Sequence, residues 1–258
     1  GLEGSSRAKY VRGTLARAAA RGWNGAAINF RSCGPSGHRR PRTYHSGFTD
    51  DLDWIVQRLR ARWRAPIGAG GFSLGGTVTL KWLGERGESA PVEAAAAVSV
   101  PYDLAACASS LDGPGFWARV YRGRFLRTLR RKSLASARRF PGALDADRVR
   151  RARTFAEFDD CVTARLFGFR DAADYWARSS SAQFVGAIRR PTLLVSAEDD
   201  PFIPAAAIPR EAIAKNPALT LALFPHGGHV GFVEGSFFAP SFAAERMAVD
   251  FLAAKLAR

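Results

Sequence analysis

Gly70-Gly71-Phe72-Ser73-Leu74-Gly75-Gly76 is the stretch that decides the fold. The residues before it, 66–70, are apolar and small, as in a buried strand, and residues 77–83 can continue as a helix. The stretch predicts a strand that ends abruptly, a serine at the apex of the turn, and a helix that begins at once. Because strand and helix pass close together beside the serine, both flanking positions are expected to require residues without a Cβ atom.

Residues 71–75 fit the pattern G-x-S-x-G of a nucleophile elbow. In such a turn the serine hydroxyl is exposed. The N–H of Leu74 and the positive end of the helix face the space where an oxyanion would form. An ordinary glycine-rich turn is the alternative interpretation. A dinucleotide-binding loop or a P-loop is excluded, because neither G-x-G-x-x-G nor Gly-Lys-Ser/Thr is present at this turn.

Length and composition favour one large α/β domain with an insertion. The chain has 258 residues, 47% of them hydrophobic, and six Trp, which is enough for a sizeable core. No apolar run approaches about 18 residues, so no transmembrane helix is expected. Cys33, Cys107 and Cys161 are odd in number and far apart. They favour reduced thiols and a cytoplasmic location over a disulfide framework or a zinc site.

The net charge of +15 is compatible with nucleic acid or an anionic membrane as a partner. Only five of the 38 basic residues are lysine, and a composition rich in Arg and Ala is also typical of GC-rich genomes. We therefore interpret most of the charge as solvated surface. No nucleic-acid partner is expected, and peripheral contact with an anionic membrane is the alternative.

Strands and helices are expected to alternate along the chain. Helices are expected over 8–21, after Thr49 as N-cap, over 204–216 and over 242–256, and further strands over 26–30, 93–100, 192–197 and 219–224. This alternation predicts a mainly parallel sheet with helices on both faces.

The alternation stops for about ninety residues that are helical in character, aromatic and rich in Arg. We assign residues 1–103 and 188–258 to the α/β core and residues 104–187 to a helical cap inserted between two strands. In this kind of fold, a cap lies over the carboxyl ends of the strands, where the site is found.

Two loops after late strands carry the residues that could complete a catalytic site. Asp199 and Asp200 follow the strand over 192–197, and His226 and His229 follow the last strand. The order Ser, Asp, His, each after its own strand, is that of the α/β-hydrolases and differs from the chymotrypsin and subtilisin orders.

The residues alone leave alternatives for the acid and the base. Asp199 could instead bond within its own turn. Asp103 follows the strand after the elbow, a position that also serves in some α/β-hydrolases. His226 competes with His229 as the base, whereas His45, in a turn before a helix, is expected to be structural.

The chain resembles the YheT-like α/β-hydrolases, which include bacterial esterases and eukaryotic relatives similar to monoacylglycerol lipases and ethanol acyltransferases. The matching stretches extend over the whole chain and are Gly1–Ser6, Asn29–Arg31 with Cys33-Gly34, Tyr44–Gly47, Gly71–Gly76, Arg153–Asp160, Asp199–Pro201 and Gly227–Phe232. Ser32 stands where the family has glycine, a departure with no obvious bearing on catalysis.

The resemblance implies a role for each site residue. Asp200 corresponds to the family acid and His229 to the base. Gly1 matches the glycine of a His-Gly pair, so the N–H of Leu2 would join that of Leu74 in the oxyanion hole. No metal or organic cofactor is needed. In the family a strand precedes this glycine and pairs between the 26–30 strand and the elbow strand. We therefore expect an N-terminally truncated chain, with a gap in the sheet, that is poorly stable alone.

These features predict a serine hydrolase that cleaves carboxylic esters through a Ser73-His229-Asp200 triad and an acyl-enzyme. The aromatic residues of the insertion suggest an apolar acyl pocket, so short- to medium-chain acyl esters or monoacylglycerol-like lipids are the expected substrates. One alternative is an alcohol acyltransferase that uses the same site. The other is a catalytically inactive, basic hydrolase-fold protein that binds membrane or nucleic acid.

Overall fold

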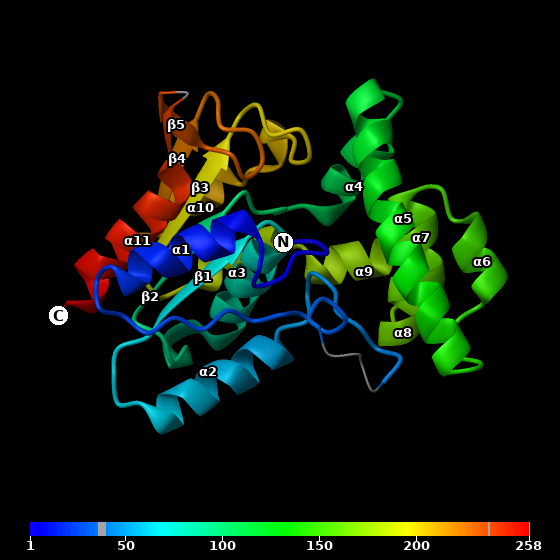
Figure 1. The fold of residues 1–258 in the computed structure, drawn as a ribbon, viewed down its shortest axis with the longest axis horizontal. Helices are drawn as coiled ribbons and strands as arrows, with labels where there is room; N and C mark the ends of the chain where they lie inside the picture. The colour runs from blue at the N-terminus through cyan, green and yellow to red at the C-terminus, as the bar shows by residue number, and fades with distance from the viewer. Residues whose placement is uncertain (36–39, 237, 258) are drawn as a thin grey trace.

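A four-stranded parallel sheet forms the centre of the molecule. The computed structural model describes residues 1–35, 40–236 and 238–257. The strands follow the order β1-β2-β3-β4 and are Gly68–Phe72, Ala94–Val98, Thr192–Ala197 and Leu219–Phe224. Since all four run in the same direction, their carboxyl ends lie at one edge of the sheet (Figure 1).

Helices cover both faces of this sheet, as predicted. One face packs against α3 (Leu74–Arg86), and the opposite face packs against α11 (Ala243–Leu256), which in turn contacts α1 (Lys9–Ala19) (Figure 1). The side chains of β2 contribute to the apolar clusters on both faces of the sheet, because successive side chains of a strand point to opposite faces. Ala95 and Ala97 join the α3 side, and Ala96 and Val98 join the α11 side.

The α3 side of the sheet holds the larger core. Trp82 of α3 is almost fully buried there, and its Nε1–H donates to Asp53 Oδ1 at 2.9 Å. This bond ties α3 to α2 (Asp50–Arg62). Four short helices also belong to the described part of the fold: η1 (Gly87–Ser89), η3 (Ser181–Ala187), η4 (Ala205–Ala207) and α10 (Arg210–Ala214).

The strand predicted over residues 26–30 is wrong. The segment pairs with no strand in the described part of the chain. In that part, β1 is an outer strand of the sheet and pairs only with β2. A strand forms only where a neighbour shares its ladder of hydrogen bonds. Side-chain contacts hold the segment instead: Asn29 Oδ1 accepts from the N–H of Ser6 at 2.8 Å, and Phe30 stacks on Tyr44.

Two further expectations differ in detail, and one hairpin was not expected at all. Thr49 precedes α2, but its hydroxyl donates to Glu85 at 2.7 Å and does not cap the helix. The helix expected over 204–216 is divided into η4 and α10, with Pro209 before α10. A hairpin of β5 (Val233–Ser236) and β6 (Ala239–Phe242) was not expected.

The segment between β2 and β3 is helical and lies beside the sheet, at the right in Figure 1. Its elements are α4 (Leu104–Asp112), α5 (Phe116–Arg139), α6 (Ala146–Arg151), α7 (Phe155–Phe158), the π-helical turn η2 (Asp159–Ala164), α8 (Arg165–Phe167) and α9 (Ala172–Ser179), and η3 follows before β3. It has its own apolar cluster, which includes Leu126, Val149 and Phe158. The division of the chain into a core and a cap at residues 104 and 187 stays a prediction.

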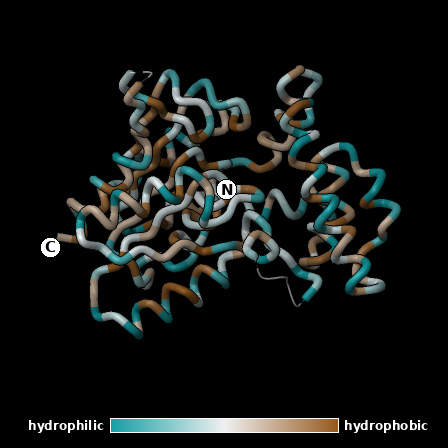
Figure 2. Tube along the Cα trace, viewed as in Figure 1, coloured by the Kyte–Doolittle hydropathy of each residue, from teal (hydrophilic) through white to brown (hydrophobic). Residues whose placement is uncertain are grey.

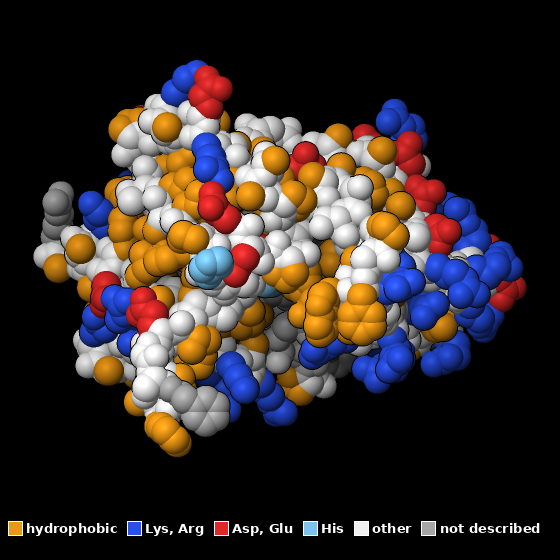
Figure 3. Space-filling model, turned by 90° about the horizontal axis from the view of Figure 1, so that it is seen from above, with side chains coloured by type: hydrophobic (Ala, Val, Ile, Leu, Met, Phe, Trp, Pro, Cys, Tyr) orange, Lys and Arg blue, Asp and Glu red, His pale blue; other side chains and the backbone are white. Residues whose placement is uncertain are grey.

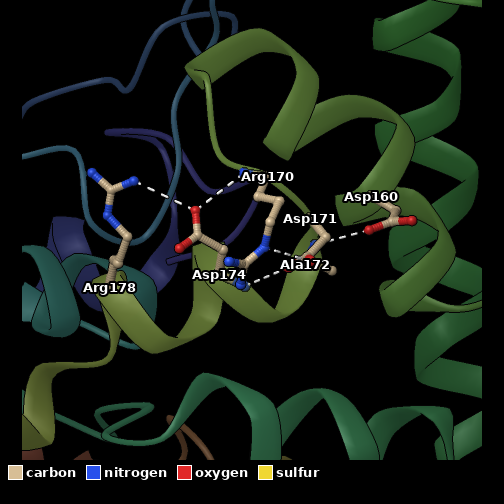
Figure 4. Close-up of polar contacts among 6 residues, drawn as sticks. All are labelled: Asp160, Arg170, Asp171, Ala172, Asp174 and Arg178. Carbon is tan, nitrogen blue, oxygen red and sulfur yellow. Dashed lines mark hydrogen bonds and ion pairs between the residues drawn. The ribbon is translucent and has the colours of Figure 1, made fainter.

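Carboxylates fix the start of α9 in this segment (Figure 4). The Asp171 side chain accepts from the N–H of Asp174 at 2.7 Å, and Asp160 accepts from the N–H of Ala172 at 2.8 Å. Negative groups at a helix N-terminus satisfy free N–H groups and complement the helix dipole. The first turn of α9 is therefore anchored to η2.

Hydropathy follows this architecture. Figure 2 shows hydrophobic residues along the sheet and its covering helices, and hydrophilic residues along much of the helical segment. Among the helices of the described residues, none is both long and apolar enough to span a membrane.

Candidate active site

Ser73 lies at the turn between β1 and α3 with φ 52° and ψ −124°. Such a conformation is costly for a residue with a Cβ atom and persists only where the surroundings enforce it. The Ser73 N–H donates to the carbonyl of Val98 at 2.8 Å, and its own carbonyl accepts from the N–H groups of Gly76 and Thr77. These bonds hold the serine at the carboxyl edge of the sheet.

The two glycines that flank Ser73 have different steric freedom. A Cβ atom on Gly71 would lie 2.6 Å from Thr79 Oγ1 and still closer to the carbonyl oxygen of Gly75. A Cβ atom on Gly75 would meet no heavy atom within 4 Å. The requirement for glycine therefore holds at Gly71, whereas the same expectation for Gly75 is wrong, because its Cβ direction points into open space.

The structure brings together the serine, one histidine and one aspartate. His229 Nε2 lies 2.8 Å from Ser73 Oγ, and His229 Nδ1 lies 2.8 Å from Asp200 Oδ2. A carboxylate can only accept, so this network assigns the proton of the neutral imidazole to Nδ1 and leaves Nε2 to accept from the serine hydroxyl. The three side chains form one continuous hydrogen-bonded chain.

Asp200 is held firmly in this arrangement. Its side chain is only 2% exposed, compared with 14% for His229. Oδ1 accepts from the N–H groups of Phe202 and Ile203 at 2.9 and 3.2 Å, which leaves Oδ2 for the imidazole. The turn after β3 thus aims one carboxylate oxygen at His229. The Phe202 ring also packs against the imidazole, with centroids 4.5 Å apart.

The other candidate acids make different contacts. Asp199 Oδ1 accepts from the N–H groups of Gly227 and Gly228 at 2.9 and 2.8 Å, and these bonds lower the pKa of Asp199. Asp199 therefore fixes the loop that carries His229. Asp103 accepts from the N–H of Ala106 and caps α4.

The two other histidines that the structure describes, His45 and His226, make different contacts. His226 is exposed, with Nδ1 3.5 Å from Asp199. His45 is buried against aromatic rings, and its Nδ1 accepts from the N–H of Gly47 at 3.1 Å. Burial lowers the pKa of His45 to about 3, so this imidazole is neutral at physiological pH.

The two predicted oxyanion donors lie in segments next to Ser73. Leu74 is the first residue of α3, and Gly1 packs so close to the elbow that a Cβ atom on it would be 3.5 Å from Ser73 Cβ. Within the described residues, the N–H groups of Leu2 and Leu74 donate to no protein acceptor. Both donors are therefore unsatisfied by the protein beside the serine.

An apolar cluster adjoins the histidine. It combines Phe202 with one side chain of the loop before α1, Leu2, and with side chains of the helical segment. The latter are Ala108, Leu111, Tyr121, Phe125, Leu129, Phe155 and Trp176. Tyr121 and Phe125 contact the Phe202 ring at centroid distances of 4.7 and 5.8 Å. Four of the aromatic residues that suggested an acyl pocket thus gather here. The role of Phe202 was missed, although it stands two residues after Asp200.

The described residues contain no group of three or more His, Cys, Asp or Glu side chains that could hold a metal ion.

The sheet, the elbow and the order of these residues define a class of protein. The sequence profile of the α/β-hydrolase fold family matches residues 1–236, so the chain belongs to that family. The predicted fold class is confirmed.

Among named proteins, the chain is 37% identical to "Putative esterase YheT" of Escherichia coli K12, over 98% of this chain and 74% of that protein. It is 32% identical to "Phospholipase ABHD3" of Bos taurus, over 99% of this chain and 62% of that protein. It is 30% identical to "Monoacylglycerol lipase" of Saccharomyces cerevisiae, over 90% of this chain but only 53% of that protein. The YheT-like resemblance and the expected class of enzyme, an esterase or lipase, are confirmed.

Solved structures agree at the level of the fold. The Pyrococcus furiosus esterase Pf2001 superimposes with a TM-score of 0.60 at 18% identity, over 99% of this chain and 81% of that chain. The Paleococcus ferrophilus monoacylglycerol lipase gives a TM-score of 0.55 at 18% identity, over 99% of this chain and 92% of that chain.

Proposed function

We propose that this chain is a serine hydrolase that cleaves carboxylic esters through an acyl-enzyme. The observation that supports this most directly is the hydrogen-bonded chain from Ser73 through His229 to Asp200 at a strained strand-to-helix turn. Ser73 Oγ attacks the ester carbonyl while His229 Nε2 takes its proton. Asp200 holds the imidazole tautomer and stabilises the imidazolium that forms.

The N–H groups of Leu2 and Leu74 are the proposed oxyanion donors. Each is unsatisfied within the described protein and lies beside the serine. Preorganised donors of this kind stabilise the charge that develops on the carbonyl oxygen. His229 then gives its proton to the leaving alcohol and activates the water that hydrolyses the acyl-enzyme.

The apolar cluster next to His229 supports an acyl-binding role. The rings of Tyr121 and Phe125 both lie against that of Phe202, which itself contacts the imidazole of His229. Such a lining favours an aliphatic acyl group over a charged one. We therefore propose short- to medium-chain acyl esters or monoacylglycerol-like lipids as substrates.

An anionic membrane surface is the proposed partner, through the outer face of α5. Phe116 and Trp117 in its first turn are each 64% exposed, and Val120 follows on the next turn. The helix sequence has nine basic residues and no acidic residue. Figure 3 shows Lys and Arg side chains gathered over the end of the molecule that carries the helical segment. Exposed aromatic rings beside basic side chains suit an anionic lipid surface. A cytoplasmic location and the lack of a nucleic-acid partner stay predictions.

The substitution Ser73→Ala tests the proposed function. Hydrolysis of p-nitrophenyl butyrate should fall by at least about 10³-fold, because the nucleophile is removed. Ser89→Ala, on an exposed serine whose hydroxyl bonds to the Arg86 carbonyl, is the matched control and should keep its rate. Full activity in Ser73→Ala would contradict the proposal. The same assay with added ethanol separates hydrolysis from acyl transfer, because transfer would yield ethyl butyrate instead of butyrate.

A further inference from the structure

A nearly buried acid stands next to one of the proposed oxyanion donors. Glu3 follows Leu2 directly, and its side chain is only 9% exposed. Its φ of 57° lies in the left-handed region, which residues other than glycine rarely adopt. The loop that carries the Leu2 N–H is thus held in a strained conformation, and the Glu3 contacts show what holds it.

Tyr44 fixes both the backbone and the side chain of Glu3. The Glu3 N–H donates to Tyr44 Oη at 2.8 Å, and the same hydroxyl donates to Glu3 Oε1 at 2.9 Å. Tyr44 is itself buried and stacked on Phe30 with a centroid distance of 5.1 Å. Burial, together with the Glu3 carboxylate, raises the pKa of Tyr44 well above its usual value. The hydroxyl therefore keeps the proton that it donates to Glu3.

Lys132 completes the contact from the helical segment. Its Nζ lies 2.9 Å from Glu3 Oε2, and it also approaches Cys33 Sγ at 3.6 Å. Lys132 belongs to α5, whereas Tyr44 belongs to the loop before α2. Glu3 thus joins the loop before α1 (residues 1–8) to two distant parts of the chain. A carboxylate with so little exposure is stable only with such partners.

The Leu2 side chain connects the same loop to the site. It packs against the cluster of Tyr44, Leu74 and Val78, and also against the apolar cluster next to His229. A backbone donor contributes to catalysis only when its direction is fixed before the reaction, since small displacements weaken transition-state stabilisation.

We propose that Glu3, held by Tyr44 and Lys132, is a positioning residue that fixes the Leu2 N–H at the oxyanion. This inference rests on the proposed function. Because Lys132 lies on α5, its ion pair with Glu3 makes the geometry of the loop that carries Leu2 depend on the position of the helical segment.

The test compares Glu3→Gln with Glu85→Gln. Glu85 is a matched control, because it also pairs with a lysine (Lys81) and accepts from a hydroxyl (Thr49), but lies near the far end of α3. The readouts are kcat and KM for p-nitrophenyl butyrate, expressed per serine titrated with a fluorophosphonate. A third readout is the inhibition constant of a trifluoromethyl ketone, whose tetrahedral adduct carries an oxyanion.

Glu3→Gln should lower kcat by about 10- to 100-fold, leave KM within about twofold, and weaken the ketone by a factor similar to that of kcat. Lys132→Met should show the same split, and Lys132→Arg should restore most of the rate. Glu85→Gln should change none of these values by more than about twofold. A role in folding alone would lower the melting temperature or the titrated fraction without changing kcat per active site.

Values of kcat and ketone affinity for Glu3→Gln within twofold of the parent would overturn the inference, as would a change in KM alone. If Glu3→Gln does not fold, Tyr44→Phe keeps the ring and removes the hydroxyl, and the absence of the kcat loss there would overturn it equally. Retained activity in Ser73→Ala would instead remove the proposed function. Normal Glu3→Gln kinetics beside an inactive Ser73→Ala would remove only this inference.

Discussion

Gly71 and Gly75 show how single positions shape the elbow. The Cβ direction of Gly71 is blocked by the backbone of Gly75 and by Thr79, whereas that of Gly75 is open. Ser73 between them keeps its strained backbone because its N–H and its carbonyl are both hydrogen-bonded, to β2 and to the first turn of α3. The steric demand of the turn is therefore concentrated on the strand side.

Gly71→Ala and Gly75→Ala should consequently differ. Gly71→Ala should lower stability by about 1–3 kcal/mol or more, because overpacking must displace the backbone of the turn. Gly75→Ala should leave stability unchanged or raise it by up to about 1 kcal/mol, since alanine is preferred to glycine within a helix. Thermal and denaturant unfolding of the two variants measures this difference. Equal losses in both variants would contradict the account of the turn.

The carboxylate of Asp159, a half-buried residue, joins two elements of the helical segment. Asp159 in η2 accepts from Thr163 Oγ1 at 2.6 Å and from Trp176 Nε1–H at 2.9 Å. Burial raises the pKa of Asp159 to about 6, despite these two hydrogen bonds. Since Trp176 also packs against the apolar cluster, this carboxyl holds one side chain of the proposed acyl pocket in place.

The raised pKa of Asp159 predicts a pH dependence of stability. In the unfolded chain an aspartate loses its proton near pH 4, whereas folded Asp159 retains it to about pH 6. The folded state therefore binds more protons in this window, and the free energy of unfolding should fall as the pH rises from about 4 to 6, by at most about 3 kcal/mol. Asp159→Asn removes this titration, so its melting temperature relative to the parent should improve between pH 4 and pH 7.

Asp147→Asn, at an exposed position, is the control and should show no such trend. A melting difference between Asp159→Asn and its parent that stays constant with pH, or that changes in the opposite direction, would show that Asp159 does not retain its proton in the fold.

The sequence could predict those elements whose pattern is local. The strands over 192–197 and 219–224 are observed with these bounds, because each is an apolar run of strand length between turn residues. The segment 26–30 has a similar pattern but forms no strand, because pairing depends on a neighbour and not on local composition. The β5–β6 hairpin was missed because Val233–Ser236 and Ala239–Phe242 show no clear alternation of apolar residues.

At the scale of the whole molecule, the parallel sheet explains why distant motifs meet. Ser73 and His229 are 156 residues apart, yet each follows a strand whose carboxyl end lies at the same edge. The order of the motifs was therefore enough to predict that Ser73 could meet an aspartate and a histidine, whereas the choice of Asp200 and His229 came from the family resemblance. The contacts of Phe202 with His229 and of Glu3 with Lys132 were not predictable, because side-chain contacts between distant segments leave no periodic signal in the sequence.

The uneven distribution of charge and exposed rings predicts membrane binding at this same scale. The double substitution Phe116→Ser/Trp117→Ser should weaken sedimentation with phosphatidylcholine–phosphatidylglycerol vesicles by about tenfold, and added salt should weaken it further. Trp54→Ser is the control, because Trp54 is similarly exposed (59%) but lies on α2. Binding that is unaffected by the double substitution, or that duplex DNA competes away, would contradict the proposed partner.

The central claim is that Ser73 is the nucleophile of a preorganised triad, and covalent labelling tests it most directly. The folded protein is treated with a fluorophosphonate, and the modified peptide is identified by mass spectrometry. We predict a single adduct on Ser73, a labelling rate at least about 10³-fold lower in His229→Ala, and no adduct in Ser73→Ala. An adduct on another residue, or a folded protein that remains unlabelled, would contradict the claim.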